Sequence, residues 1–98
     1  MAEIIWTLEA SRCLEEIYEC IALDSPNSAH KVASGIYAKI QLLRRQPRLG
    51  QRYEPIADRE VREVLFGHYR IAYVVETDER VEILGIFHSA MEIERHLK

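Results

Sequence analysis

The chain is 98 residues long, of which 48% are hydrophobic and 30% are charged. A chain of this length forms one domain, residues 1–98, with one modest core, and its composition excludes an intrinsically disordered protein. The net charge of −3 and the isoelectric point of about 5.8 count against strong, unaided binding to nucleic acid.

Neither export nor membrane insertion is indicated. No apolar run approaches the roughly 20 residues that a membrane span needs. Residues 1–6 lack the basic start and the longer apolar stretch of a signal peptide. We therefore expect a cytoplasmic protein that does not bind membranes.

The two cysteines do not form an obvious chemical site. Cys13 and Cys20 lie two turns apart in one expected helix, about 10 Å along its axis, which is too far for a disulfide. We expect reduced, partly buried thiols. No zinc-type spacing occurs, and no metal or cofactor is expected.

Residues 3–6 predict a short opening strand, and two helices follow. Thr7 is a good N-cap for the first helix. Ser25 and Pro26 begin the second, because serine caps a helix and proline suits its first position. Apolar side chains recur at helical spacing in both segments, and Gln46-Pro47 ends the second. The link is short, so we expect an antiparallel hairpin. The apolar stripes comprise Ala10, Leu14, Ile17, Tyr18 and Ile21, and then Ala29, Val32, Ala33, Ile36, Tyr37, Ile40 and Leu43.

Three strand-like runs, rich in Val, Ile, Tyr and Phe, lie back to back in residues 61–75 and 81–88. They are broken at Gly67 and at residues 77–80, which predicts an antiparallel meander. Side chains alternate along the middle strand, so one face holds the bulkier residues and the other holds Arg70. We expect the bulkier face to lie under the helices and Arg70 to lie on the opposite, more open face.

Together these elements predict an α+β fold. A short N-terminal strand and an antiparallel helix hairpin are packed on a small antiparallel sheet. Residues 47–60 are a polar connection between the second helix and the sheet. Residues 89–98 are expected to be a short C-terminal tail.

Positive charge is concentrated in residues 44–62, although the whole chain is acidic. The segment holds Arg44, Arg45, Arg48, Arg52, Arg59 and Arg62, with the acidic residues Glu54, Asp58 and Glu60. Six positive charges against three negative ones leave a local charge of +3. Two interpretations stay open, a solvated connection or a docking surface for an acidic partner. The candidate partner-binding residues are Arg44, Arg45, Arg48, Arg52 and Arg59.

Several short motifs, taken in order, resemble one known family. They are Trp6-Thr7-Leu8-Glu9-Ala10, Leu14-Glu15-Glu16-Ile17-Tyr18-Glu19-Cys20-Ile21-Ala22, Asp24-Ser25-Pro26, Pro47-Arg48-Leu49-Gly50, Arg62-Glu63-Val64, Tyr69-Arg70-Ile71-Ala72-Tyr73 and Ile83-Leu84-Gly85-Ile86-Phe87-His88. Each motif is weak alone, but together and in this order they are specific. Over residues 4–88 the chain resembles the RelE/ParE toxin family of bacterial toxin–antitoxin modules.

The resemblance implies a small α+β toxin that a cognate antitoxin holds inactive, while another part of the antitoxin binds operator DNA. RelE-like members enter the ribosomal A site and cleave mRNA, whereas ParE-like members inhibit DNA gyrase and lack the nuclease residues. The motifs at residues 24–26 and 47–50 look more like the ParE branch. We expect the antitoxin to cover apolar surface between the helix hairpin and the sheet, with acidic residues near the Arg44–Arg62 segment.

If the chain is a nuclease, the resemblance implies four candidate catalytic residues, Arg70, His88, Arg62 and Glu54. Cleavage by the RNA 2′-hydroxyl needs a base, an acid and a cation at the phosphate. Arg70 suits the cation and His88 suits proton transfer near neutrality, while Glu54 matches a loop glutamate only loosely. Arg70 is equally compatible with a structural ion pair to a glutamate on a neighbouring strand, and also occurs in gyrase-directed members. His88 is equally compatible with a strand-end histidine that makes a backbone hydrogen bond.

Two departures from the RelE branch favour the ParE branch. RelE-like nucleases are usually strongly basic, whereas this chain is acidic. RelE-like nucleases often carry arginine or tyrosine close after the last strand, whereas here no positive charge occurs between His88 and Arg95. The preferred hypothesis is a toxin that inhibits DNA gyrase and is not an enzyme. The alternatives are a ribosome-dependent mRNA endonuclease and a non-toxic binding module of the same fold.

Overall fold

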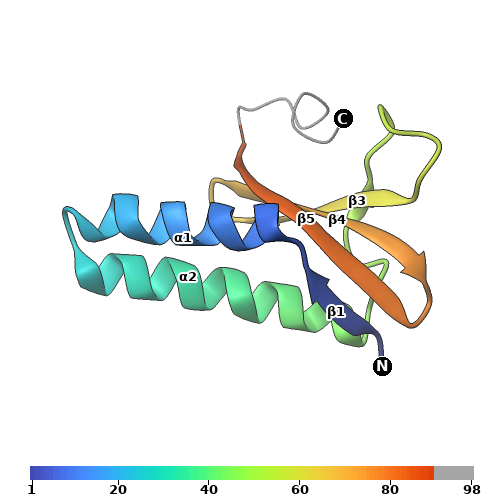
Figure 1. The fold of residues 1–98 in the computed structure, drawn as a ribbon, viewed down its shortest axis with the longest axis horizontal. Helices are drawn as coiled ribbons and strands as arrows, with labels where there is room; N and C mark the ends of the chain where they lie inside the picture. The colour runs from blue at the N-terminus through green and yellow to red at the C-terminus, as the bar shows by residue number, and fades with distance from the viewer. Residues whose placement is uncertain (90–98) are drawn as a thin grey trace.

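Two antiparallel helices and a five-stranded sheet form the two layers of the computed structural model (Figure 1). The structure describes residues 1–89, so most of the expected tail, residues 90–98, lies outside the described part. The elements in chain order are β1 (Glu3–Trp6), α1 (Leu8–Ala22), α2 (Pro26–Gln41), the 3-10 helix η1 (Leu42–Arg44), β2 (Gln51–Arg52), β3 (Val61–Phe66), β4 (Tyr69–Thr77) and β5 (Arg80–His88). The α+β class and the helix hairpin are therefore confirmed.

The sheet has the strand order β1-β5-β4-β3-β2. Strands β3, β4 and β5 form the expected antiparallel meander, with Gly67 at φ 58° in the β3–β4 turn. The opening strand differs from expectation, because β1 pairs in parallel with β5 and makes the sheet mixed. The short strand β2 pairs with Arg62 and Glu63 of β3 and was not predicted. Its polar residues, Gln51 and Arg52, carry no apolar alternation that marks a strand.

Both helices begin where their capping residues predict. The Thr7 side chain accepts a hydrogen bond from the Ala10 N–H at 3.1 Å and donates one to the Ile83 carbonyl at 2.7 Å. The first cap thus also anchors α1 to β5. The Ser25 hydroxyl accepts a hydrogen bond from the Ser28 N–H at 3.2 Å, and Pro26 occupies the first helical position.

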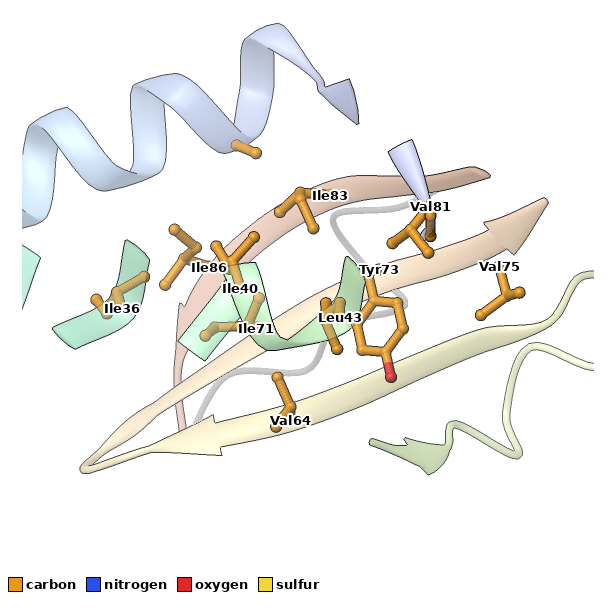
Figure 2. Packing of buried hydrophobic residues seen from close by; sticks show 12 residues of the cluster. Ile36, Ile40, Leu43, Val64, Ile71, Tyr73, Val75, Val81, Ile83 and Ile86 are labelled. Atoms are coloured by element: carbon orange, nitrogen blue, oxygen red, sulfur yellow. The ribbon is translucent and has the colours of Figure 1, made fainter. Parts of the chain in front are cut away.

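The main core lies between the helix hairpin and one face of the sheet. Figure 2 shows Ile36 and Ile40 of α2, with Leu43, packed over Ile71 and Tyr73 of β4. These side chains are fully buried, so the bulkier face of β4 lies under the helices as expected. On the opposite face Ala72 and Phe87 form a smaller apolar cluster with the partly buried Tyr53 and Leu84.

A β-bulge in β5 decides which side chains share a face near its end. Ala72 pairs with Gly85 and Tyr73 pairs with Ile83, so Leu84 is an extra residue without a partner on β4. Before the bulge Ile83 points into the main core, and after it Ile86 does so. The extra residue thus reverses the alternation of side chains for the rest of the strand.

No helix within residues 1–89 combines the length and the apolar character that crossing a membrane requires.

Candidate functional site

Arg70, the predicted phosphate-binding cation, forms a salt bridge with Glu63 of the neighbouring strand. Its guanidinium donates to Glu63 Oε2 through Nε at 2.9 Å and through Nη2 at 2.6 Å. The same group lies 5.8 Å from the centre of the Tyr53 ring and donates weakly to the Ser89 carbonyl at 3.4 Å. Only 17% of the Arg70 side chain is exposed. Glu63 belongs to the neighbouring strand β3, so the alternative of a structural ion pair describes this arginine.

His88 lies on the other face of the sheet. It pairs across the strands with Tyr69, whose ring packs against the main core under the helices. The Tyr69 and His88 rings meet edge to face at 6.2 Å, and His68 stacks on His88 at 6.3 Å. Cross-strand partners project from the same face, so His88 and Arg70 point to opposite faces. The structure does not bring these two candidates together around one phosphate.

The other two nuclease candidates, Arg62 and Glu54, make no hydrogen bond or ion pair with Arg70 or His88 among the described residues. Arg62 donates to Glu60 Oε2 at 2.8 Å through Nε and to the Gly50 carbonyl at 2.7 Å through Nη1. Glu54 is exposed in a turn after β2, and no hydrogen bond or ion pair among the described residues joins it to the other candidates. Arg62 therefore supports the connection before β3, and no hydrogen bond or ion pair within residues 1–89 joins the four candidates to one another.

A polar network fixes the connection that the sequence marks as positively charged. Arg48 donates to both carboxylate oxygens of Glu60, at 2.9 and 3.1 Å, and to Asp78 at 2.7 Å. Burial of Glu60 acts to raise its pKa, but hydrogen bonds from Arg62 and Arg48 outweigh that effect and lower the pKa below its ordinary value. Hydrogen bonds to Asp78 and Glu60 raise the pKa of Arg48.

The network continues into the core through a tyrosine. The buried Tyr73 hydroxyl accepts a hydrogen bond from the Gly50 N–H at 2.8 Å. Burial raises the pKa of this tyrosine above its ordinary value. A Cβ atom at Gly50 would overlap the backbone carbonyl of Glu63, so only glycine allows this close approach.

The five partner-binding candidates divide into two groups. Arg48 is held by Glu60 and Asp78, and Arg59 lies 3.6 Å from Glu76. The other three are exposed and have no salt bridge within the part of the chain that the structure describes; they are Arg44, Arg45 and Arg52. Part of the positive charge of residues 44–62 is therefore neutralised by carboxylates of the same chain.

An apolar groove lies between the two helices. It has a volume of about 440 Å³ and is lined by Trp6, Ser11, Leu14, Glu15, Tyr18, Ala33 and Tyr37. The Trp6 and Tyr37 rings stack with their centres 6.3 Å apart. Tyr37 is 52% exposed and Tyr18 is 39% exposed. A solvent-facing surface of this kind, rich in aromatic side chains, is typical of protein-binding sites.

Sequence reasoning missed which residues line this groove. It assigned Tyr18 and Tyr37 to the apolar stripes of the helices without indicating that they stay uncovered. The hairpin extends past the edge of the sheet in Figure 1, so the sheet covers only part of the stripes. The signal in the sequence is the width of each stripe, which exceeds the contact that one small sheet can supply.

The cysteines and acidic residues do not form a metal site in residues 1–89. No group of three or more His, Cys, Asp or Glu side chains is suitably placed there. Both cysteines are free thiols, as expected. Burial raises the pKa of the Cys13 thiol, whereas Cys20 is exposed and the expectation that it is partly buried is wrong. Cys20 belongs to the last turn of α1, and Figure 1 shows this end of the helix extending past the sheet.

Comparison with known proteins identifies the family. The family model described as ParE toxin of type II toxin-antitoxin system, parDE, matches residues 4–93. A solved structure, the chromosomal ParDE TA system from P. aeruginosa, is similar with a TM-score of 0.73 and 23% identity over 90% of this chain and 96% of that chain. At this identity the likeness concerns the fold alone. None of the curated proteins matches the sequence. The family model spans nearly the whole chain, which therefore belongs to the ParE toxin family of type II toxin–antitoxin systems.

Proposed function

We propose that this chain is a toxin that inhibits DNA gyrase by binding it, and that it catalyses no reaction itself. The observation that carries the choice is the placement of Arg70 and His88 on opposite faces of the sheet. Cleavage of RNA needs a cation, a base and an acid around one phosphate. An arginine bound to Glu63 and a histidine on the far face do not supply that arrangement.

The overall charge supports the same choice. A ribosome-dependent nuclease must dock on RNA, and that docking normally rests on many unopposed lysines and arginines. This chain carries a net charge of −3, and several of its arginines hold carboxylates of their own. A protein target in the cytoplasm suits such a surface better than ribosomal RNA does.

We further propose that a cognate antitoxin neutralises the toxin by covering the groove between α1 and α2. The groove offers exposed aromatic side chains, including Tyr18 and Tyr37, that a partner can bury. Acidic residues of the same antitoxin would pair with the exposed arginines Arg44, Arg45 and Arg52. In this proposal operator DNA is bound only through the antitoxin.

A supercoiling assay tests the proposed target. Purified, antitoxin-free chain at micromolar concentration should block supercoiling of relaxed plasmid by DNA gyrase, and the heat-denatured chain should not. Unaffected supercoiling would contradict the gyrase proposal.

Pulse labelling after induction in cells separates the alternatives. Early loss of thymidine incorporation is expected, because gyrase inhibition stops replication first. Early loss of methionine incorporation, with cleaved transcripts, would instead identify a ribosome-dependent endonuclease. Unchanged incorporation of both would identify a non-toxic binding module.

A further inference from the structure

The groove continues over α1 onto a strongly acidic surface. Ser11 and Glu15 line both the apolar groove and a second depression on the outer side of α1. The other residues of that depression are Leu8, Arg12, Glu16 and Glu19. A partner segment seated in the groove therefore lies against Glu15 and has the remaining carboxylates at its edge.

Within residues 1–89 the carboxylates on α1 lie in no salt bridge, whereas several on the sheet side do. Residues Leu8–Ala22 contain four glutamates, at positions 9, 15, 16 and 19, against the single Arg12, which leaves a charge of −3 on this helix. Within residues 1–89 none of these glutamates lies in a salt bridge, whereas Glu60, Glu63, Glu76 and Asp78 each hold an arginine. The charge of α1 is thus available to an incoming molecule.

We propose that the segment filling this groove is an amphipathic part of the antitoxin whose flank over α1 carries lysine or arginine. The inference rests on the proposed function, in which the antitoxin covers the groove. Apolar side chains of the segment would bury Tyr18 and Tyr37, while its cations would face Glu15, Glu16 and Glu19. An acidic flank would be repelled by the same carboxylates, so this surface selects between antitoxins of different charge.

The charge of the flank sets how binding responds to salt. The carboxylates of α1 lie at the exposed rim, where attraction between opposite charges speeds association and is screened by salt. The apolar contact in the centre of the groove is far less sensitive to salt. Preference for a basic flank should therefore be large in dilute buffer and should shrink at high ionic strength.

Two designed peptides provide the test. Both are amphipathic helices of about 20 residues with the same leucine-rich apolar face. One carries lysine along both flanks and the other carries glutamate. The lysine peptide is expected to bind the wild-type chain at least about tenfold more tightly at low salt. The double substitution Glu15→Lys and Glu19→Lys should reverse that preference.

Matched variants identify what each result means. Glu79→Lys changes the charge by the same amount per residue, but in the turn between β4 and β5, and should leave the preference intact. Tyr18→Ala with Tyr37→Ala should weaken both peptides, because it removes the aromatic walls of the groove. Equal binding of the two peptides, tighter binding of the glutamate peptide, or no binding of either would overturn the inference. The gyrase assay uses neither peptide, so the proposed function is judged separately.

Discussion

The two sides of this molecule use charged residues in opposite ways. On the sheet side, several carboxylates and arginines are joined in pairs, as Arg70 is to Glu63 and Arg48 and Arg62 are to Glu60. On the helix side, the glutamates of α1 have no salt-bridge partner within residues 1–89, and aromatic rings line an open groove. The comparison shows that a dense cluster of charge in the sequence does not by itself mark a binding surface.

The difference follows from how each region is held in place. The connection between η1 and β3 has only the two-residue strand β2, so it is fixed by polar contacts among Arg48, Glu60, Arg62 and Gly50. The helix hairpin is fixed by its inner apolar stripe, which leaves the outer side chains free to meet a partner. Polar groups that stabilise the fold are thus unavailable for recognition, and apolar groups that the fold leaves open are available.

The largest expected effect is on binding at the helix groove. Replacing Tyr18 and Tyr37 together by alanine should weaken antitoxin binding by about 100-fold or more, because aromatic side chains dominate such contacts. The free energy of unfolding should fall by only about 1–2 kcal/mol, since 39% of Tyr18 and 52% of Tyr37 is exposed. Calorimetric titration with the purified antitoxin measures the first and urea unfolding measures the second.

Leu65→Ala is the matched control for that experiment. Leu65 is 58% exposed on β3, so this substitution removes exposed apolar surface from the sheet side and leaves the helix groove intact. Binding should change by no more than about twofold. If Leu65→Ala weakened antitoxin binding as much as the double tyrosine substitution does, the proposed difference between the helix side and the sheet side would be contradicted.

The next largest effect concerns stability on the sheet side. Gly50→Ala places a methyl group against the backbone carbonyl of Glu63, which cannot move without disturbing β3. We expect a loss of about 1–3 kcal/mol in the free energy of unfolding. Gly35→Ala in α2 places its methyl group against the end of the Phe66 ring, a side chain that can rotate away. Urea unfolding should therefore rank Gly50→Ala as the more damaging, and the opposite order would contradict the close packing inferred at Gly50.

A smaller effect is expected from the Arg70–Glu63 pair. Arg70→Gln and Glu63→Gln should each destabilise the fold, and a double-mutant cycle should give a coupling free energy of about 1 kcal/mol, because both side chains are mostly buried. Thermal or urea unfolding of the four proteins measures it. A coupling indistinguishable from zero would mean that Arg70 is not committed to Glu63 and would reopen its assignment to a nuclease site.

The smallest effect is the pH dependence contributed by Glu60. Its pKa is lower in the folded chain than in the unfolded chain, so the stabilisation is fully present above the unfolded value and is lost as pH falls through the folded value. Glu60→Gln should remove about 0.5–1 kcal/mol at neutral pH and flatten the decline of stability below about pH 4.5. Urea unfolding at a series of pH values from about 3 to about 7 measures how the free energy of unfolding changes with pH. Glu15→Gln, which removes a carboxylate without a salt bridge, should flatten it less.

Local signals in the sequence were sufficient for the helices and for the placement of Arg70. Thr7, Ser25 and Pro26 fix where the helices begin through contacts within a few residues. The alternation along β4 placed Arg70 on the face away from the helices, and a glutamate on the neighbouring strand does pair with it. These features depend on short-range geometry, which the order of residues specifies directly.

Long-range features escaped sequence reasoning. The parallel pairing of β1 with β5 depends on how the chain returns after the hairpin and not on the residues of β1 alone. Because of the bulge at Leu84, His88 and Arg70 project from different faces of the sheet, and nothing in the alternation of residues 81–88 signals it. The exposure of the groove between α1 and α2 depends on how far the sheet extends along the helix hairpin, which Figure 1 shows to be only part of its length.

Hydroxyl-radical footprinting of the chain, alone and bound to its antitoxin, tests the division between the two regions most directly. The method reports side-chain exposure at aromatic residues, which occur on both sides of the molecule. The account predicts that Trp6, Tyr18 and Tyr37 become protected in the complex, while Tyr53 on the sheet side keeps its reactivity. Protection of Tyr53 with unchanged reactivity of Tyr18 and Tyr37 would contradict it, because the antitoxin would then bind the sheet and leave the helix groove open.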